Sequence, residues 1–147
     1  AGTIFTLFYM NVYKVFSVNK EKTLSLIGSI FGVLGGFCLM GVGMTPADLY
    51  LDLHVLCAHW LFRFMFAASF LYTVVIFHHP KFENKYAGGY LIFSCSILLY
   101  ILISEFGPDP KLNSFALMLQ VISQKIILII FIVAVYIQTL GLQKLYK

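Results

Sequence analysis

Three polar side chains share one face of a long apolar segment, where they could bind a ligand or exchange a proton. Asp52, His59 and Arg63 are seven and four residues apart, which places His59 and Arg63 each within about 20° of Asp52 on an ideal helix. A charge inside a bilayer costs free energy, so Arg63 must face protein, water or a ligand. One interpretation is a polar site that opens from the extracytoplasmic side, in which Arg63 holds an anionic group and His59 titrates. The other is a structural arginine that pairs with carboxylates or backbone carbonyls of neighbouring helices.

A second cation, Lys125, lies near the middle of the last apolar segment, beside Gln124. From the helical rise, Arg63 and Lys125 both lie about 15 Å from the outer side. The deepest available acid is Glu105, at an outer helix end, which we expect to be too shallow to reach both cations. The missing negative charge would then come from a helix end that tilts inward, a further segment or a bound anion. An anionic lipid headgroup fits this pattern.

The sequence lacks the patterns that metal, haem or catalytic chemistry needs. His54 and His59 are five residues apart, which is not the helical i, i+4 spacing, and His54 points to the face opposite Arg63. No nucleophile elbow, zinc-protease motif, phosphate loop or acidic pair on one helix face occurs. We therefore expect a non-enzymatic protein without a metal or cofactor. The cysteines form no disulfide framework and are interpreted as packing residues: Cys38, Cys57 and Cys95.

Composition indicates that membrane-spanning helices position these residues. Hydrophobic residues make up 61% of the chain and charged residues only 11%, whereas soluble domains average about 25% charged residues. This predicts a single domain, residues 1–147, with an all-α fold: an integral membrane helical bundle. Four full transmembrane helices are expected over residues 24–44, 53–77, 87–104 and 114–140, the last capped by Ser114. Residues 1–16 are expected to form a truncated span, which we favour, or an interfacial helix.

Three glycines in the first full span recur every four residues and so share one face: Gly28, Gly32 and Gly36. Small residues at this spacing let two helix backbones approach closely in lipid. The face could mediate dimerisation or pack against helices of the same bundle. We favour packing within the bundle.

The lysines predict an orientation in the membrane. If every apolar segment crosses once, one side receives six lysines: Lys20, Lys22, Lys81, Lys85, Lys144 and Lys147. The other side receives Lys111 and four acids. Because cytoplasmic loops collect lysine, the lysine-rich loops and the C-terminus are predicted to be cytoplasmic. The net charge of +4 therefore reflects topology, and no nucleic-acid partner is expected.

A short motif precedes the segment that carries Arg63. Gly41, Gly43 and Pro46 read as G-x-G-x-x-P, and His54 and Ala58 follow as H-x-x-x-A; a Gln-Lys pair at residues 124–125 stands in the last span. With these residues the chain resembles the DRAM/Frag-type membrane proteins and their prokaryotic relatives of unknown function. The resemblance covers roughly residues 24–141 and departs at the front, where those proteins usually have a full first span. It implies an integral membrane protein with no established catalytic activity, some relatives being linked to lipid organisation or membrane trafficking.

We expect a non-enzymatic integral membrane protein that binds a lipid or a protein partner through an intramembrane cationic site. The predicted site residues are Asp52, His59, Arg63, Gln124 and Lys125. One alternative is an accessory subunit of a larger membrane complex, or a homo-oligomer, in which the cations pair with a partner's acids. The other is a transporter of a small organic anion.

Overall fold

Every regular element in the described part of the chain is helical. The computed structural model describes residues 1–17, 21–80, 82–110 and 112–145. The elements are α1 (Gly2–Phe16), α2 (Lys22–Met44), α3 (Leu51–His78), the short 3-10 helix η1 (Asn84–Tyr86), α4 (Ala87–Phe106) and α5 (Ser114–Leu145). The helices α2 to α5 are long and apolar enough to cross a membrane, and α1 is shorter. The predicted fold class is confirmed, and α3, α4 and α5 run a few residues beyond the predicted apolar segments.

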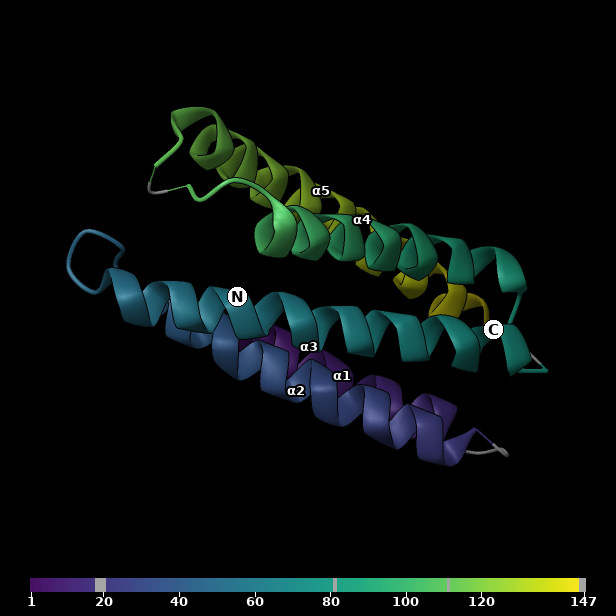
Figure 1. The fold of residues 1–147 in the computed structure, drawn as a ribbon. Helices are drawn as coiled ribbons and strands as arrows, with labels where there is room; N and C mark the ends of the chain where they lie inside the picture. Colours follow the sequence, from purple (N-terminus) through teal and green to yellow (C-terminus); the bar gives the residue numbers. More distant parts are fainter. Residues whose placement is uncertain (18–20, 81, 111, 146–147) are drawn as a thin grey trace.

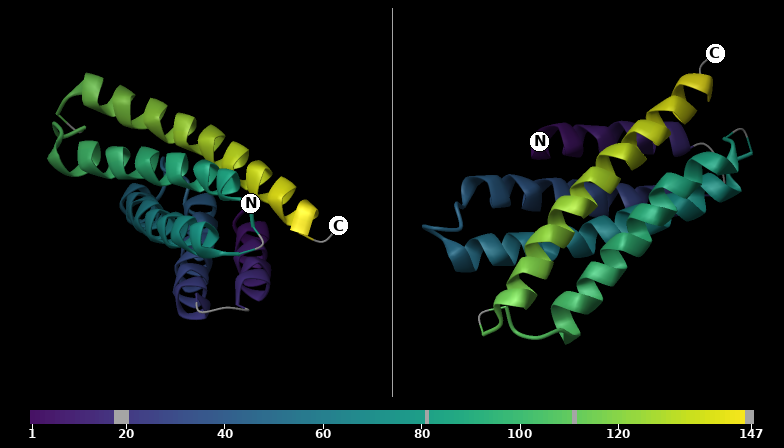
Figure 2. Two further views of the ribbon diagram at one scale, coloured as in Figure 1. Left: turned by 90° about the vertical axis from the view of Figure 1, so that its right-hand side faces the viewer. Right: turned by 90° about the horizontal axis from the view of Figure 1, so that it is seen from above.

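The helices form two parts that cross obliquely (Figures 1 and 2). Along the chain, α1 packs on α2, α2 on α3, α3 on α4 and α4 on α5. The pair α4–α5 is a hairpin that lies across the three-helix part (Figure 2). α1 runs alongside α2 and packs on it (Figure 2).

The repeated glycines of α2 receive side chains from both neighbouring helices. A Cβ added at Gly28 would lie 3.2 Å from the ring of Tyr72 on α3, and one added at Gly32 would overlap the ring of Tyr9 on α1. At Gly36 it would overlap the side chain of Thr6. The glycine face of α2 is therefore covered by α1 and α3, and the close approach of these helices depends on the missing side chains.

Buried hydroxyl groups connect the three-helix part. The Tyr72 hydroxyl lies 2.5 Å from the Ser29 hydroxyl and donates to the Ser25 carbonyl at 3.2 Å. Ser29 in turn donates to the Tyr9 carbonyl at 3.0 Å. Since no water is available inside a bilayer, such bonds between helices hold them together without competition from solvent.

The connections α1–α2 and α3–α4 and the C-terminus lie at one end of the molecule, and the connections α2–α3 and α4–α5 lie at the other (Figure 1). At the first end Glu83 forms ion pairs with Lys85 and, at 3.5 Å, with Lys144 of α5. We call this the lysine end and the opposite one the outer end. Four lysines used to predict the orientation lie outside the described residues: Lys20, Lys81, Lys111 and Lys147.

The predicted cap of the last helix is wrong by one residue. The side-chain oxygen of Asn113 accepts hydrogen bonds from the backbone N–H groups of Phe115, at 2.9 Å, and Ala116, at 3.2 Å. Asn113 therefore caps α5, and Ser114 is its first helical residue.

Candidate functional site

A polar pocket of about 750 Å³ lies between α3, α4 and α5 at the outer end. Two turns border it: the α2–α3 turn through Ala47 and the α4–α5 turn through Pro110. Four of the five predicted site residues line it, namely Asp52, His59, Arg63 and Gln124. The polar pocket also contains three polar side chains that sequence analysis did not select: Tyr100, Ser104 and Gln120.

The charge of Arg63 is compensated inside the chain. One terminal nitrogen forms an ion pair with Glu105 of α4, and the other donates to the His59 carbonyl at 3.1 Å. The ring nitrogen Nδ1 of His59 lies 3.9 Å from the same Glu105 oxygen. Both partners of Arg63 lie outward of its own position on α3, so the guanidinium extends toward the outer end. Glu105 thus reaches Arg63, although the sequence indicated an acid too shallow to serve both cations.

A hydrogen bond joins α4 and α5 at the inner limit of the polar pocket. The side-chain amide of Gln124 donates to the Tyr100 hydroxyl at 2.8 Å. The ring of Tyr100 packs on that of Phe62, with their centroids 4.5 Å apart. Gln124 is therefore positioned by α4 while its side chain borders the space in front of α3.

Lys125 is not part of the polar pocket. Its side chain is exposed on α5, although the neighbouring Gln124 faces inward. All six acidic residues of the chain are among the described residues, and none of them forms an ion pair with Lys125 within that part of the molecule. The structure therefore does not bring the two predicted cations together, and it leaves Lys125 without an internal counter-charge.

The G-x-G-x-x-P motif forms the turn between α2 and α3. The Pro46 carbonyl accepts hydrogen bonds from the N–H groups of Leu49, at 3.1 Å, and Tyr50, at 2.8 Å. The His54 ring lies 2.7 Å from the Thr45 carbonyl and so joins the turn to the start of α3. Ala58 lines the polar pocket. A Cβ added at Gly41 would lie 2.6 Å from the Cys57 sulfur, whereas Gly43 faces open space. The motif thus determines the conformation of the turn that joins α2 to α3 at the outer end.

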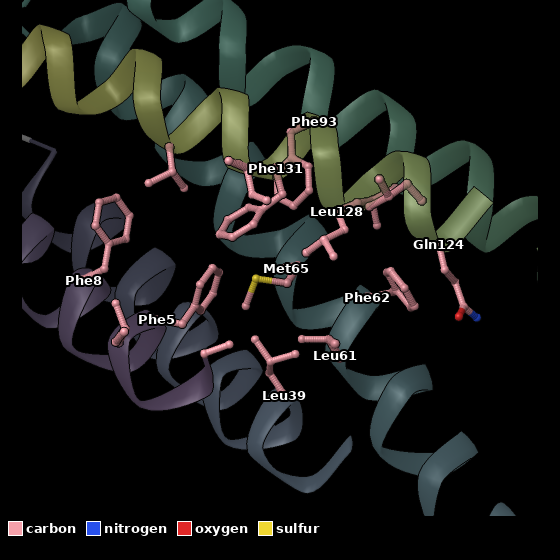
Figure 3. A pocket seen from close by; sticks show the side chains of 16 residues that line it. Phe5, Phe8, Leu39, Leu61, Phe62, Met65, Phe93, Gln124, Leu128 and Phe131 are labelled. Carbon is pink, nitrogen blue, oxygen red and sulfur yellow. The ribbon is translucent and has the colours of Figure 1, made fainter. Parts of the chain in front are cut away.

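A second cavity, the apolar cleft, adjoins the polar pocket and is shown in Figure 3. It has a volume of about 470 Å³ and separates α5 from α1 and α3. Figure 3 shows Phe5 and Phe8 of α1 on one side and Leu128 and Phe131 of α5 on the other. The polar pocket and the apolar cleft share two lining residues, Phe62 and Gln124.

A carboxylate partner for Arg63 was one of the two interpretations of the sequence, but Glu105 was not named as that partner, and the apolar cleft was not predicted. Glu105 was visible as the deepest acid, and the length of an arginine side chain was the available signal for the contact. No signal in the sequence indicated the apolar cleft, because its lining residues resemble those of any lipid-facing surface.

Comparison of the chain with protein families, with curated proteins and with solved structures finds no match. The resemblance to DRAM/Frag-type proteins therefore stays a prediction.

Proposed function

We propose that this protein binds a phospholipid from one leaflet, with its headgroup in the polar pocket and an acyl chain in the apolar cleft. The observation that carries the proposal is that the two cavities adjoin, with Phe62 and Gln124 lining both. The polar cavity lies at the outer end, beside the turns, and the apolar one lies deeper. A lipid in a bilayer has the same order, with its headgroup at the surface and its chains toward the midplane.

The charges in the polar pocket favour a headgroup that carries both signs. Arg63 retains guanidinium hydrogens beyond those used by Glu105 and the His59 carbonyl, and these could bind a phosphate oxygen. Asp52 is exposed on the same cavity and could accept hydrogen bonds from an ammonium group. A phosphoethanolamine headgroup satisfies both. Because Glu105 already neutralises Arg63, a net negative lipid is not required, in contrast to the expectation from two unpaired cations.

The proposal concerns binding without catalysis in a multi-pass integral membrane protein. We place the lysine end in the cytoplasm, because Lys22, Lys85 and Lys144 lie there and cytoplasmic loops collect lysine. The polar pocket then lies in the extracytoplasmic leaflet, and the lipid enters from the bilayer through the space between α3 and α5.

Native mass spectrometry of the protein in nanodiscs of mixed phosphatidylethanolamine and phosphatidylglycerol tests the proposal. We expect one retained phosphatidylethanolamine per chain, lost or much reduced in Arg63→Gln. Asp52→Asn should retain a phospholipid but lose the preference for the amine headgroup. Lys125→Gln is the matched control, since it removes a cation outside both cavities and should retain the lipid as the native chain does.

Three results would contradict the proposal. One is that no lipid is retained, and another is that Arg63→Gln and Lys125→Gln reduce lipid retention equally. The third is that Asp52→Asn, which alters only an exposed side chain, leaves the headgroup preference unchanged.

A further inference from the structure

Lys125 lies on the side of α5 that faces away from the rest of the chain. It precedes Ala134 by nine residues, about two and a half helical turns, so the two side chains lie on opposite faces. Ala134 packs against α4, where a Cβ added at Gly89 would lie 3.3 Å from its Cα. The neighbours of Lys125 on its own face are exposed and apolar: Met118, Ile122 and Ile129. We call these three residues and Lys125 the outer face of α5.

The cation of Lys125 is too deep to reach the membrane surface easily. α5 has 32 residues, about 48 Å, and so extends beyond a hydrocarbon core about 30 Å thick. Lys125 lies about 7 Å from the middle of this helix along its axis. A lysine stem extends only about one helical turn, so the ammonium group stays within the hydrocarbon region unless the bilayer thins around it. Arg63 lies at a similar depth, but its side chain reaches the carboxylate of Glu105.

The described part of the chain supplies no counter-charge for Lys125. Of the six acids, Asp48 lies in the turn before α3, Asp52 in the first turn of α3, Glu105 at the end of α4 and Asp109 in the turn that follows. Glu21 and Glu83 lie at the lysine end. Every acid is therefore near a membrane surface, whereas Lys125 is near the midplane.

We infer that the outer face of α5 docks a membrane-spanning helix of another protein, which carries an Asp or Glu at mid-membrane depth opposite Lys125. Charge complementarity selects this occupant, because an exposed intramembrane cation gains most from a carboxylate at the same depth. A symmetric second copy of the chain fits poorly, since it would place Lys125 against Lys125 and its own acids at the membrane surfaces. The four residues of this face line neither cavity, whereas Val121, Leu128 and Ile132, which lie beside Lys125 on α5, do. The inference is argued from charge and does not depend on the proposed function.

A model helix tests the inference without knowledge of the natural partner. The probe is a synthetic leucine–alanine transmembrane peptide with one central Asp, compared with the same peptide carrying Leu there. Energy transfer from the labelled peptide to a fluorescent tag at the C-terminus measures association in phosphatidylcholine vesicles. We expect the Asp peptide to bind about tenfold more tightly than the Leu peptide.

Variants of the full chain assign that preference to one residue. Lys125→Leu should abolish the preference for Asp and, because it removes a charge from a lipid-facing surface, should fold at least as well as the native chain. Lys125→Arg should retain the preference. Lys144→Leu is the control, since it removes a lysine from the same helix near its end.

Equal binding of the Asp and Leu peptides would overturn the inference. So would an Asp preference that survives in Lys125→Leu. A third refuting result is a native chain that ignores the Asp peptide but concentrates phosphatidylglycerol around Lys125, which would assign the cation to a lipid headgroup. Lipid retention in the polar pocket is measured separately, so the failure of one proposal leaves the other testable.

Discussion

Replacing Glu105 by Gln should destabilise the protein more than replacing its partner Arg63 by Gln. The two side chains form an ion pair, and they are 42% and 28% exposed respectively. Without Glu105, Arg63 retains only the His59 carbonyl and cannot lose its proton. Without Arg63, the Glu105 side chain remains at the outer end of α4, where it is the more exposed of the two and water can solvate its charge. The asymmetry follows from this difference in exposure.

The magnitude follows from the partial burial of the pair. Two unit charges about 4 Å apart attract by about 4 kcal/mol at an effective dielectric constant of about 20. Desolvation and side-chain ordering offset roughly half of this. We therefore expect the free energy of unfolding to fall by about 3 kcal/mol in Glu105→Gln, by about 2 kcal/mol in Arg63→Gln and by about 3 kcal/mol in the double variant. The double variant thus loses about 2 kcal/mol less than the two single variants together, and this difference is the coupling energy of the pair.

Reversible unfolding in bicelles, followed for the native chain and the three variants, measures this coupling. Lys125→Gln is the control, since Lys125 is a cation at a similar depth without an acid partner, and it should show no coupling to Glu105→Gln. The reasoning is refuted if the single variants add to the double within about 0.5 kcal/mol. It is also refuted if Arg63→Gln proves the more costly single variant.

Two further predictions concern helix packing and the lysine end. Gly32→Ala should lower the melting temperature by several degrees because the added methyl group overlaps the ring of Tyr9. Gly43→Ala is the control, since its added methyl group meets nothing within 4 Å and should leave the melting temperature unchanged. Equal melting temperatures of the two variants, measured by circular dichroism, would argue against this packing of α1 on α2. The hydrogen bond from Lys85 holds the pKa of Glu83 below its usual range, so this carboxylate stabilises the lysine end above the ordinary glutamate value of about 4.3 and loses that effect as the pH falls. The protection of the amides at the end of α5, measured relative to their intrinsic exchange rate at each pH, should therefore fall in acid in the native chain and be lower but less pH-dependent in Glu83→Gln.

The sequence predicts the helices well because their signal is local. A run of apolar residues long enough to cross a bilayer must form a helix, since no other conformation pairs its backbone groups in lipid. The shared face of Asp52, His59 and Arg63 is equally local, since it depends only on the 3.6-residue period, and all three line the polar pocket. The order of short connections also suffices to predict that consecutive helices pack on one another.

The position of Lys125 shows where that local signal ends. In a soluble helix the polar side marks the surface, but α5 is apolar almost all round, so its sequence does not distinguish the side facing α4 from the side facing lipid. A lysine in such a helix can point either way, and the rotation of α5 is fixed by tertiary contacts such as that of Ala134 with Gly89 and the hydrogen bond from Gln124 to Tyr100. The apolar cleft is unpredictable for a similar reason, since it arises from the oblique crossing of the α4–α5 hairpin and not from any residue pattern.

The two cations at similar depth thus have opposite consequences for the chain. Arg63 lies between helices and has an acid, a carbonyl and a polar cavity, so its charge is compensated within the chain and is available to a ligand. Lys125 faces away from the bundle and forms no ion pair among the described residues. Placing its charge in the hydrocarbon region of a bilayer therefore costs the isolated protein free energy. A residue with that cost is understandable if its counter-charge belongs to another molecule. We therefore propose a ligand at Arg63 and a partner at Lys125, and the variants described above test the two proposals separately.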